Sequence, residues 1–120
     1  MGAPMAADPL NILIVEDESL IAMMIEDFVD LLGHAVCGSC DSVAGAIARI
    51  EEGGVDAVIL DVNLRDGPSW PVADALAARG IPFVFASGGH VDAPGHDNAP
   101  LLSKPFTMDG VKLAIEGFAG

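Results

Sequence analysis

Continuous apolar runs are the feature that most constrains the fold of this 120-residue chain. Three of them, rich in Ile, Val, Leu and Phe and without polar alternation, span residues 12–15, 57–60 and 83–86. Strands buried on both faces carry such runs, because helices cover both sides of a parallel sheet. The runs therefore predict three central strands, and the more polar segments 35–39 and 101–103 predict the two edge strands.

Segments of helical periodicity separate the predicted strands. In the first, apolar residues recur at three- and four-residue steps from Ile21 to Leu32, and Gly33 follows as a common C-terminal stop. Asp41 and Ser42 can cap a second helix, which Gly53 and Gly54 end. The first two helices therefore lie between the three strands nearest the N-terminus.

Two further helices follow in the C-terminal half. Pro71 and Gly80 bracket one of them, and Thr107 can cap the last. Between residues 87 and 99, where another helix would be expected, three glycines and Pro94 interrupt the chain. We expect this fourth helix of the pattern to be short or disordered.

The alternation of strands and helices with short connections predicts an α/β fold. Right-handed crossovers between parallel strands give a doubly wound sheet, and five strands fit the order 2-1-3-4-5 of flavodoxin-like folds. We expect residues 1–9 to form a disordered tail and residues 10–120 to form one domain, since this length suits a single core.

Charge restricts the partners of such a domain. Five Lys and Arg against 18 Asp and Glu give a net charge of −13, which repels nucleic acids and anionic membranes. No stretch is long and apolar enough for a membrane span, and residues 1–9 lack the features of a secretory signal. We therefore expect a cytoplasmic protein whose partners are cations and other proteins, with no nucleic acid and no membrane.

Two cysteines allow a redox interpretation as well as a structural one. Cys37 and Cys40 have the spacing of a thioredoxin-like pair. Such a pair needs a helix N-terminus to activate a thiolate, whereas these residues lie near the end of a predicted edge strand. We favour two reduced, partly buried side chains.

Polar residues at the ends of the predicted strands mark the candidate site. Ligands of an open α/β sheet bind beyond the carboxyl ends of its strands, where the strand order reverses. The residues that end or follow strands one, three, four and five are Glu16, Asp17, Asp61, Ser87 and Lys104. Three carboxylates therefore converge, with one hydroxyl and one ammonium group beside them.

Converging carboxylates predict a cation site, because a cation relieves their mutual repulsion. A small set of hard oxygen ligands suits Mg2+. We expect Asp17 and Asp61 to be direct ligands, Glu16 to act through water, and the backbone carbonyl of Asn63 to complete the set.

Asp61 is the expected nucleophile of this site. A carboxylate can attack phosphorus and form an aspartyl phosphate, while Mg2+ and Lys104 balance the charge of the transferred group. Ser87 can then hydrogen-bond the phosphoryl group and sense it. Each residue also has an ordinary structural explanation, such as acids at a helix N-terminus or a solvated lysine. Their convergence at one sheet edge favours the functional interpretation.

Four motifs in this order and spacing are similar to those of a known family. They are Ile-Leu-Ile-Val-Glu-Asp-Glu (12–18), Leu-Asp-Val-Asn-Leu (60–64), Phe-Ala-Ser-Gly (85–88) and Ser-Lys-Pro-Phe (103–106). Over residues 10–118 the chain resembles the receiver domain of bacterial two-component response regulators.

The resemblance implies a phosphoprotein with a defined donor. Asp61 would accept phosphate from a sensor histidine kinase or a histidine phosphotransfer protein, with Mg2+ in the acidic pocket. The domain would be no enzyme beyond its own phosphorylation and dephosphorylation. A cis Lys104–Pro105 bond is also implied. The output would be binding of a downstream protein, onward phosphorelay, or drainage of phosphate from a kinase.

Within the family the chain resembles a single-domain group with Phe-Ala-Thr-Gly-Tyr after the fourth strand. Here Ser87 replaces Thr, Gly89 replaces Tyr, and Leu101 stands where an aromatic switch residue is usual. We therefore expect ordering of the loop from Gly88, rather than aromatic rotation, to report phosphorylation. A phosphorylation-independent interaction module on the same scaffold is the alternative.

Two other activities fit the residues less well. A flavodoxin-like electron carrier needs a phosphate-binding loop after the first strand, where Glu16, Asp17 and Glu18 would repel phosphate. An aspartate-based phosphatase usually has its nucleophile after the first strand and a second acid two residues later, whereas Asp61 follows the third strand and precedes Asn63.

Overall fold

The fold is a parallel sheet between two layers of helices. The computed structural model describes residues 9–87, 95, 101–103 and 106–119. The sheet has the order β2-β1-β3-β6-β7, which confirms the predicted order 2-1-3-4-5 for the five main strands. These strands are β1 (Asn11–Val15), β2 (Ala35–Cys40), β3 (Ala57–Asp61), β6 (Phe83–Ser87) and β7 (Leu101–Ser103).

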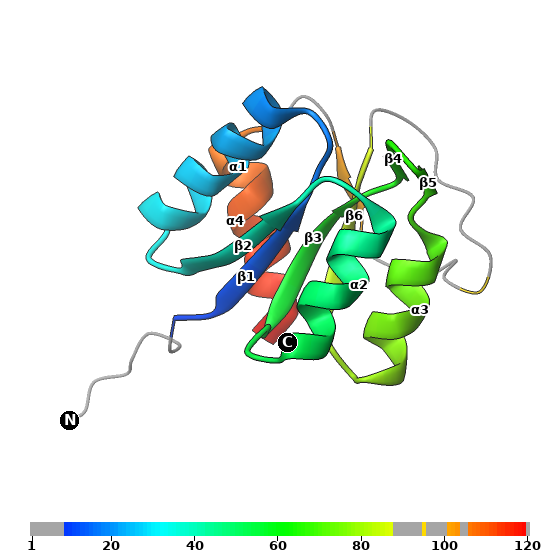
Figure 1. Cartoon of the computed structure of the whole chain (residues 1–120). Helices are drawn as coiled ribbons and strands as arrows, with labels where there is room; N and C mark the ends of the chain where they lie inside the picture. The colour runs from blue at the N-terminus through cyan, green and yellow to red at the C-terminus, as the bar shows by residue number, and fades with distance from the viewer. Residues whose placement is uncertain (1–8, 88–94, 96–100, 104–105, 120) are drawn as a thin grey trace.

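In the part of the chain that the structure describes, two helices cover each face of the sheet (Figure 1). On one face α1 (Ser19–Leu31) lies beside α4 (Met108–Ala119), and on the other α2 (Val43–Glu52) lies beside α3 (Trp70–Ala78). Each face has its own apolar core, one built around Ile14 and Ile59 and the other around Leu13 and Leu60. The two cores explain why the central strands are apolar at consecutive positions.

Burial of both faces stabilises the central strands. All five residues of β3 are buried, as are Ile12 to Val15 of β1. Full burial of one Val, Leu or Ile side chain contributes roughly 1.5–3 kcal/mol. The strand ends are therefore fixed in position, and with them the polar residues that follow.

The N-termini of the helices show why the chain turns where it does. Ser42 precedes α2, and its hydroxyl accepts a hydrogen bond from the Gly45 N–H at 3.0 Å. Thr107 acts in the same way toward the Gly110 N–H at 3.0 Å. Gly33 follows α1 with a φ of 89°, a conformation that favours glycine. These caps agree with the sequence-based predictions.

The buried face of α1 differs in detail from the predicted one. The fully buried residues are Ala22, Ile25 and Val29. The sequence pattern correctly predicts Ile25 in the core. The other apolar positions of the pattern are only partly buried, namely Ile21, Met24, Phe28 and Leu32. The buried stripe is therefore centred on Ala22, Ile25 and Val29, and the partly buried side chains lie beside it.

A short hairpin after β3 was not predicted. Its strands β4 (Asn63–Leu64) and β5 (Gly67–Pro68) pair in antiparallel fashion between Asp61 and α3. The Asp66–Gly67 dipeptide, where the loop enters β5, is a recognised turn signal. Strands this short carry no periodicity, which is why only the dipeptide could have indicated them.

An irregularity in β2 was also not predicted. Ile12 pairs with Val36, but Leu13 pairs with Gly38, so Cys37 is an extra residue in the edge strand. The register shift turns both Cys37 and Cys40 toward the core that Leu13 joins.

Some predictions concern residues outside the described part of the chain. They are the disordered tail over residues 1–9, of which only Pro9 is described, the short or disordered helix between residues 87 and 99, of which only Ser87 and Gly95 are described, and the geometry of Lys104–Pro105. Within the described residues, no helix is both long and apolar enough to span a membrane.

The cap of α2 gives a stability prediction. Ser42→Ala leaves the Gly45 N–H without its side-chain acceptor, so the free energy of unfolding should fall by about 1 kcal/mol in urea denaturation. The control Ser39→Ala, at an exposed position of β2, should change it by less than about 0.5 kcal/mol. Equal effects of the two substitutions would contradict the assigned cap.

Candidate functional site

The site lies at the carboxyl edge of β1 and β3, which are neighbours in the sheet. Asp61 is the last residue of β3, and Glu16 and Asp17 directly follow β1. The Glu16 N–H donates to the Cys40 carbonyl at 2.9 Å, which extends the pairing of β1 with β2 by one residue. Two adjacent parallel strands thus deliver acidic residues to one place.

The three carboxylates are close together. Glu16, Asp17 and Asp61 each offer one carboxylate oxygen, and these oxygens all lie within 4.8 Å of one another. Glu16 is 3% exposed and Asp61 is 8% exposed, whereas Asp17 is open to solvent. One Glu16 oxygen accepts the Glu18 N–H at 3.1 Å, just before α1 begins. The cluster is therefore buried at its base and accessible at Asp17.

This donor set fits Mg2+. All three groups are hard, anionic oxygen donors, and their spacing allows one small cation to contact more than one of them. A divalent cation would also offset the repulsion between carboxylates that the strands hold together. The site is thus compatible with the cofactor that the sequence predicts.

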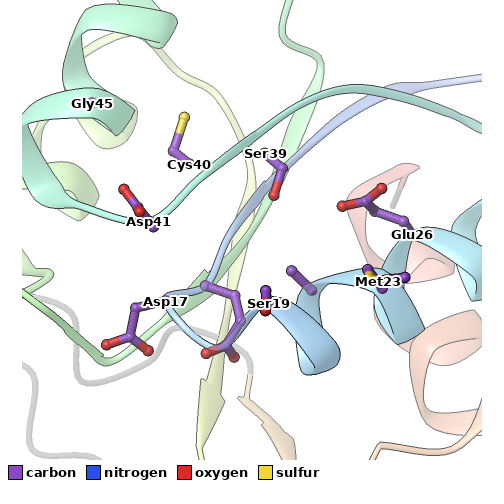
Figure 2. Close-up of a pocket in the computed structure, with 10 residues that line it drawn as sticks. Asp17, Ser19, Met23, Glu26, Ser39, Cys40, Asp41 and Gly45 are labelled. Atoms are coloured by element: carbon purple, nitrogen blue, oxygen red, sulfur yellow. The ribbon is translucent and has the colours of Figure 1, made fainter.

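A cavity of about 500 Å³ borders two of the three carboxylates, Glu16 and Asp17. Figure 2 shows it between the start of α1, the end of β2 and the start of α2, with Asp17 and Glu26 on opposite sides. Asp41, between β2 and α2, also lines it. A water molecule occupies about 30 Å³ of liquid, so the cavity can admit the water ligands that Mg2+ usually keeps.

The remaining predicted site residues lie along the same sheet edge or outside the described residues. Ser87 is half-buried at the end of β6, one residue after Ala86, which pairs with Asp61. Asn63 is exposed at the start of β4. Lys104 lies outside the residues that the structure describes. The structure therefore brings together Glu16, Asp17 and Asp61 and places Ser87 and Asn63 in adjoining segments.

Asp66 is a polar residue near the site that sequence reasoning missed. From the tip of the β4–β5 hairpin its carboxylate accepts the Val43 N–H at 2.7 Å and the Ala44 N–H at 3.3 Å. The pKa of the Asp66 carboxyl is below its ordinary value, mainly because of the hydrogen bond from the Val43 N–H. Only the Asp66–Gly67 turn dipeptide could have drawn attention to it.

The cysteines have the properties of structural thiols. Both are free and partly buried. Burial raises the pKa of the Cys37 and Cys40 thiols, although the Arg49 guanidinium opposes the effect. Both residues belong to the strand β2 and not to the N-terminus of a helix, where the thiolate of a redox pair is activated. This agrees with the structural interpretation favoured from the sequence.

Comparison with known proteins gives consistent matches. The sequence model of the response regulator receiver domain family matches residues 12–116. The phyllosphere-induced regulator PhyR of Methylorubrum extorquens is 35% identical over 95% of this chain, which spans 45% of that protein.

A solved structure matches nearly the whole of this chain. The solution structure of SdrG from Sphingomonas melonis Fr1 is 58% identical, with a TM-score of 0.83 over 97% of this chain and 100% of that one. The solution structure of the BeF3-activated conformation of SdrG from Pseudomonas melonis Fr1 is also 58% identical, with a TM-score of 0.80 over 94% of this chain and 99% of that one.

The close carboxylates predict that the metal-free protein is less stable than it would be with one carboxylate fewer, and that Mg2+ binding restores stability. In metal-free protein Asp17→Asn should raise the free energy of unfolding by about 1 kcal/mol, because it removes one of three clustered charges. Millimolar Mg2+ should stabilise the wild type more than the variant. The control Asp27→Asn, on the exposed side of α1, should show neither effect. A destabilised metal-free Asp17→Asn protein would contradict the repulsion.

The raised thiol pKa values predict slow alkylation. Only the thiolate reacts, so Cys37 and Cys40 should react with iodoacetamide more slowly at pH 7 than a cysteine in an unfolded peptide. The rate should increase as the pH rises toward the raised pKa values. Mass spectrometry after timed quenching measures the rate, and peptide-like labelling at pH 7 would contradict the assignment.

Proposed function

The chain belongs to the response regulator receiver domain family, and from this premise we propose that Asp61 is its phosphoacceptor. The donor is a phosphohistidine of a sensor histidine kinase or of a histidine phosphotransfer protein. One observation carries the proposal. Carboxylate oxygens of Glu16, Asp17 and Asp61 lie within 4.8 Å of one another at the carboxyl edge of the sheet, and Asp61 is buried at the end of β3.

In the proposed transfer, a carboxylate oxygen of Asp61 attacks phosphorus. A P–O bond forms, the P–N bond of the phosphohistidine breaks, and the imidazole leaves and takes up a proton. The fixed end of β3 holds the nucleophile in place, since all five residues of this strand are buried.

Glu16, Asp17 and Asp61 are the side chains that would hold Mg2+, with the backbone carbonyl of Asn63 as a further ligand. When bound, the ion neutralises negative charge on the transferred phosphoryl group. We assign direct coordination to Asp17 and Asp61, and coordination through water to Glu16.

Two further residues act on the phosphoryl group in this proposal. Ser87 lies at the end of β6, the strand that pairs with β3, and donates its hydroxyl to a phosphoryl oxygen. Lys104 provides the balancing positive charge. The Ser87 bond senses the phosphoryl group, and ordering of the loop from Gly88 then reports phosphorylation.

The SdrG relative supports this proposal. Its activation by BeF3, a group that resembles phosphoryl in shape and charge, indicates that a protein 58% identical to this chain responds to a phosphoryl mimic. By analogy, phosphorylation of this chain would change the surface that it offers to a partner.

The proposed output is a protein–protein contact or onward phosphorelay. A net charge of −13 favours a partner with a basic surface and disfavours nucleic acid and anionic membranes. The downstream protein would recognise the phosphorylated form.

A second candidate is a phosphorylation-independent interaction module on the same scaffold. The observation in its favour is Leu101, which is 47% exposed at the start of β7, where an aromatic switch residue is usual. The experiment that tests phosphorylation also separates the two candidates, because the module requires no phosphoryl group.

Incubation with Mg2+ and a small phosphodonor, followed by intact mass measurement, tests the proposal. The wild type should gain one phosphoryl group, and chelation of the metal should sharply reduce the labelled fraction. Asp61→Asn should abolish labelling. Asp56→Asn, at the opposite end of β3, is the matched control and should label like the wild type. Normal labelling of Asp61→Asn would place the acceptor elsewhere, and an unlabelled wild type would favour the module.

A further inference from the structure

The β4–β5 hairpin connects the proposed phosphoacceptor to α3 and is held at its base and middle. The Ser69 N–H donates to the Val62 carbonyl at 2.9 Å, which closes the base one residue after Asp61. Leu64, 6% exposed, anchors the middle in the core on the α2–α3 side of the sheet. Gly67 has a φ of 135°, which an L side chain rarely adopts.

Asp66 connects the tip of the hairpin to α2 by hydrogen bonds. Its two oxygens accept the N–H groups of Val43 and Ala44, and Ser42 accepts that of Gly45. The first three N–H groups of α2 therefore all have side-chain acceptors, and two of these bonds come from the hairpin. The lowered pKa of the Asp66 carboxyl is consistent with this arrangement.

An ion pair adds to the contact at the same corner. Arg65 lies 3.3 Å from the Asp41 carboxylate, but both side chains are more than half exposed. Exposed pairs of this kind contribute little, so the Asp66 bonds are the main attachment of the tip. A hairpin with two-residue strands has little stability of its own and depends on such tertiary contacts.

We propose that Asp66 is a positioning residue for the phosphorylation site. By attaching the hairpin tip to α2, it fixes the peptide of Asn63 between two secured points and so sets the affinity of the carboxylate cluster for Mg2+. The inference rests on the proposed function, because it concerns the same cation and the same acceptor, Asp61. It assigns a role to α2, which contributes none of the proposed ligands.

A purely structural role predicts a different result. If Asp66 only caps α2, its loss lowers stability and leaves Mg2+ affinity unchanged. Asp56 provides the matched control, since its exposed carboxylate accepts the Asn11 N–H at 2.8 Å and its loss removes the same charge. That bond lies at the start of β1 and β3, at the opposite end of the sheet from the site.

We expect the fluorescence of Trp70 to report Mg2+ binding. It is the only tryptophan, lies two residues after the hairpin, and packs edge-to-face on Phe85 with ring centroids 5.6 Å apart. Titration with Mg2+ under fluorescence detection therefore needs no phosphodonor. Hydrogen exchange of residues 62–68 in metal-free protein reports attachment of the hairpin independently.

The experiment compares the wild type with Asp66→Ala, Asp66→Asn and Asp56→Ala. Asp66→Ala should weaken Mg2+ binding by about 10-fold, within the range for groups that orient metal ligands. It should also speed amide exchange in residues 62–68. Asp66→Asn, which keeps one acceptor oxygen for the Val43 N–H, should show a smaller change in the same direction. Asp56→Ala should bind Mg2+ like the wild type.

Wild-type Mg2+ affinity in the folded Asp66 variants overturns the positioning role and leaves the proposed function intact. Equal weakening by Asp56→Ala also overturns it, because general destabilisation then explains the loss. If Asp66→Ala does not fold, Asp66→Asn decides by the same criteria. A wild type that neither binds Mg2+ nor accepts phosphoryl overturns both proposals.

Discussion

Repulsion between carboxylates held at one edge of the sheet is the constraint on which the proposed function depends. Glu16, Asp17 and Asp61 bring oxygens within 4.8 Å of one another, and two of these residues are almost fully buried. Such crowding costs folding free energy unless a cation offsets it. The apolar cores on both sides of the sheet stabilise β1 and β3, and the carboxylates at the ends of these strands reduce that stability by repelling one another. Such a site favours binding of a cation, and in the proposed function the cation then helps to bind the phosphoryl group.

The topology explains why so few residues suffice. In a parallel sheet every strand ends at the same edge, so adjacent β1 and β3 place their terminal acids together without a dedicated binding loop. The hairpin after β3 then extends the same edge toward α2, where Asp66 holds it. The proposed nucleophile ends a strand whose five residues are all buried, while the residue proposed to position its surroundings lies on a hairpin that α2 restrains.

Much of the fold and part of the site follow from the sequence, because they depend on strong periodic signals. Consecutive apolar residues identified the central strands, their alternation with helices gave the sheet order, and the strand ends gave the carboxylates. Details that arise from tertiary packing did not follow. The buried stripe of α1 includes Ala22 and Val29, which the pattern of larger apolar residues did not indicate. The extra residue Cys37 changes the register of β2, and Asp66 accepts hydrogen bonds from N–H groups 22 and 23 residues away. No local pattern encodes a hydrogen bond between a turn and the start of a distant helix.

A crystal structure of the protein grown with Mg2+ and beryllofluoride would show whether the carboxylate cluster binds a metal ion and a phosphoryl mimic together. We expect one metal ion coordinated by oxygens of Asp17 and Asp61, and beryllium bonded to the other carboxylate oxygen of Asp61. The Ser87 hydroxyl should lie within hydrogen-bond distance of a fluorine. An empty carboxylate cluster at saturating concentrations of both reagents, or an adduct on any other residue, would contradict the proposed function.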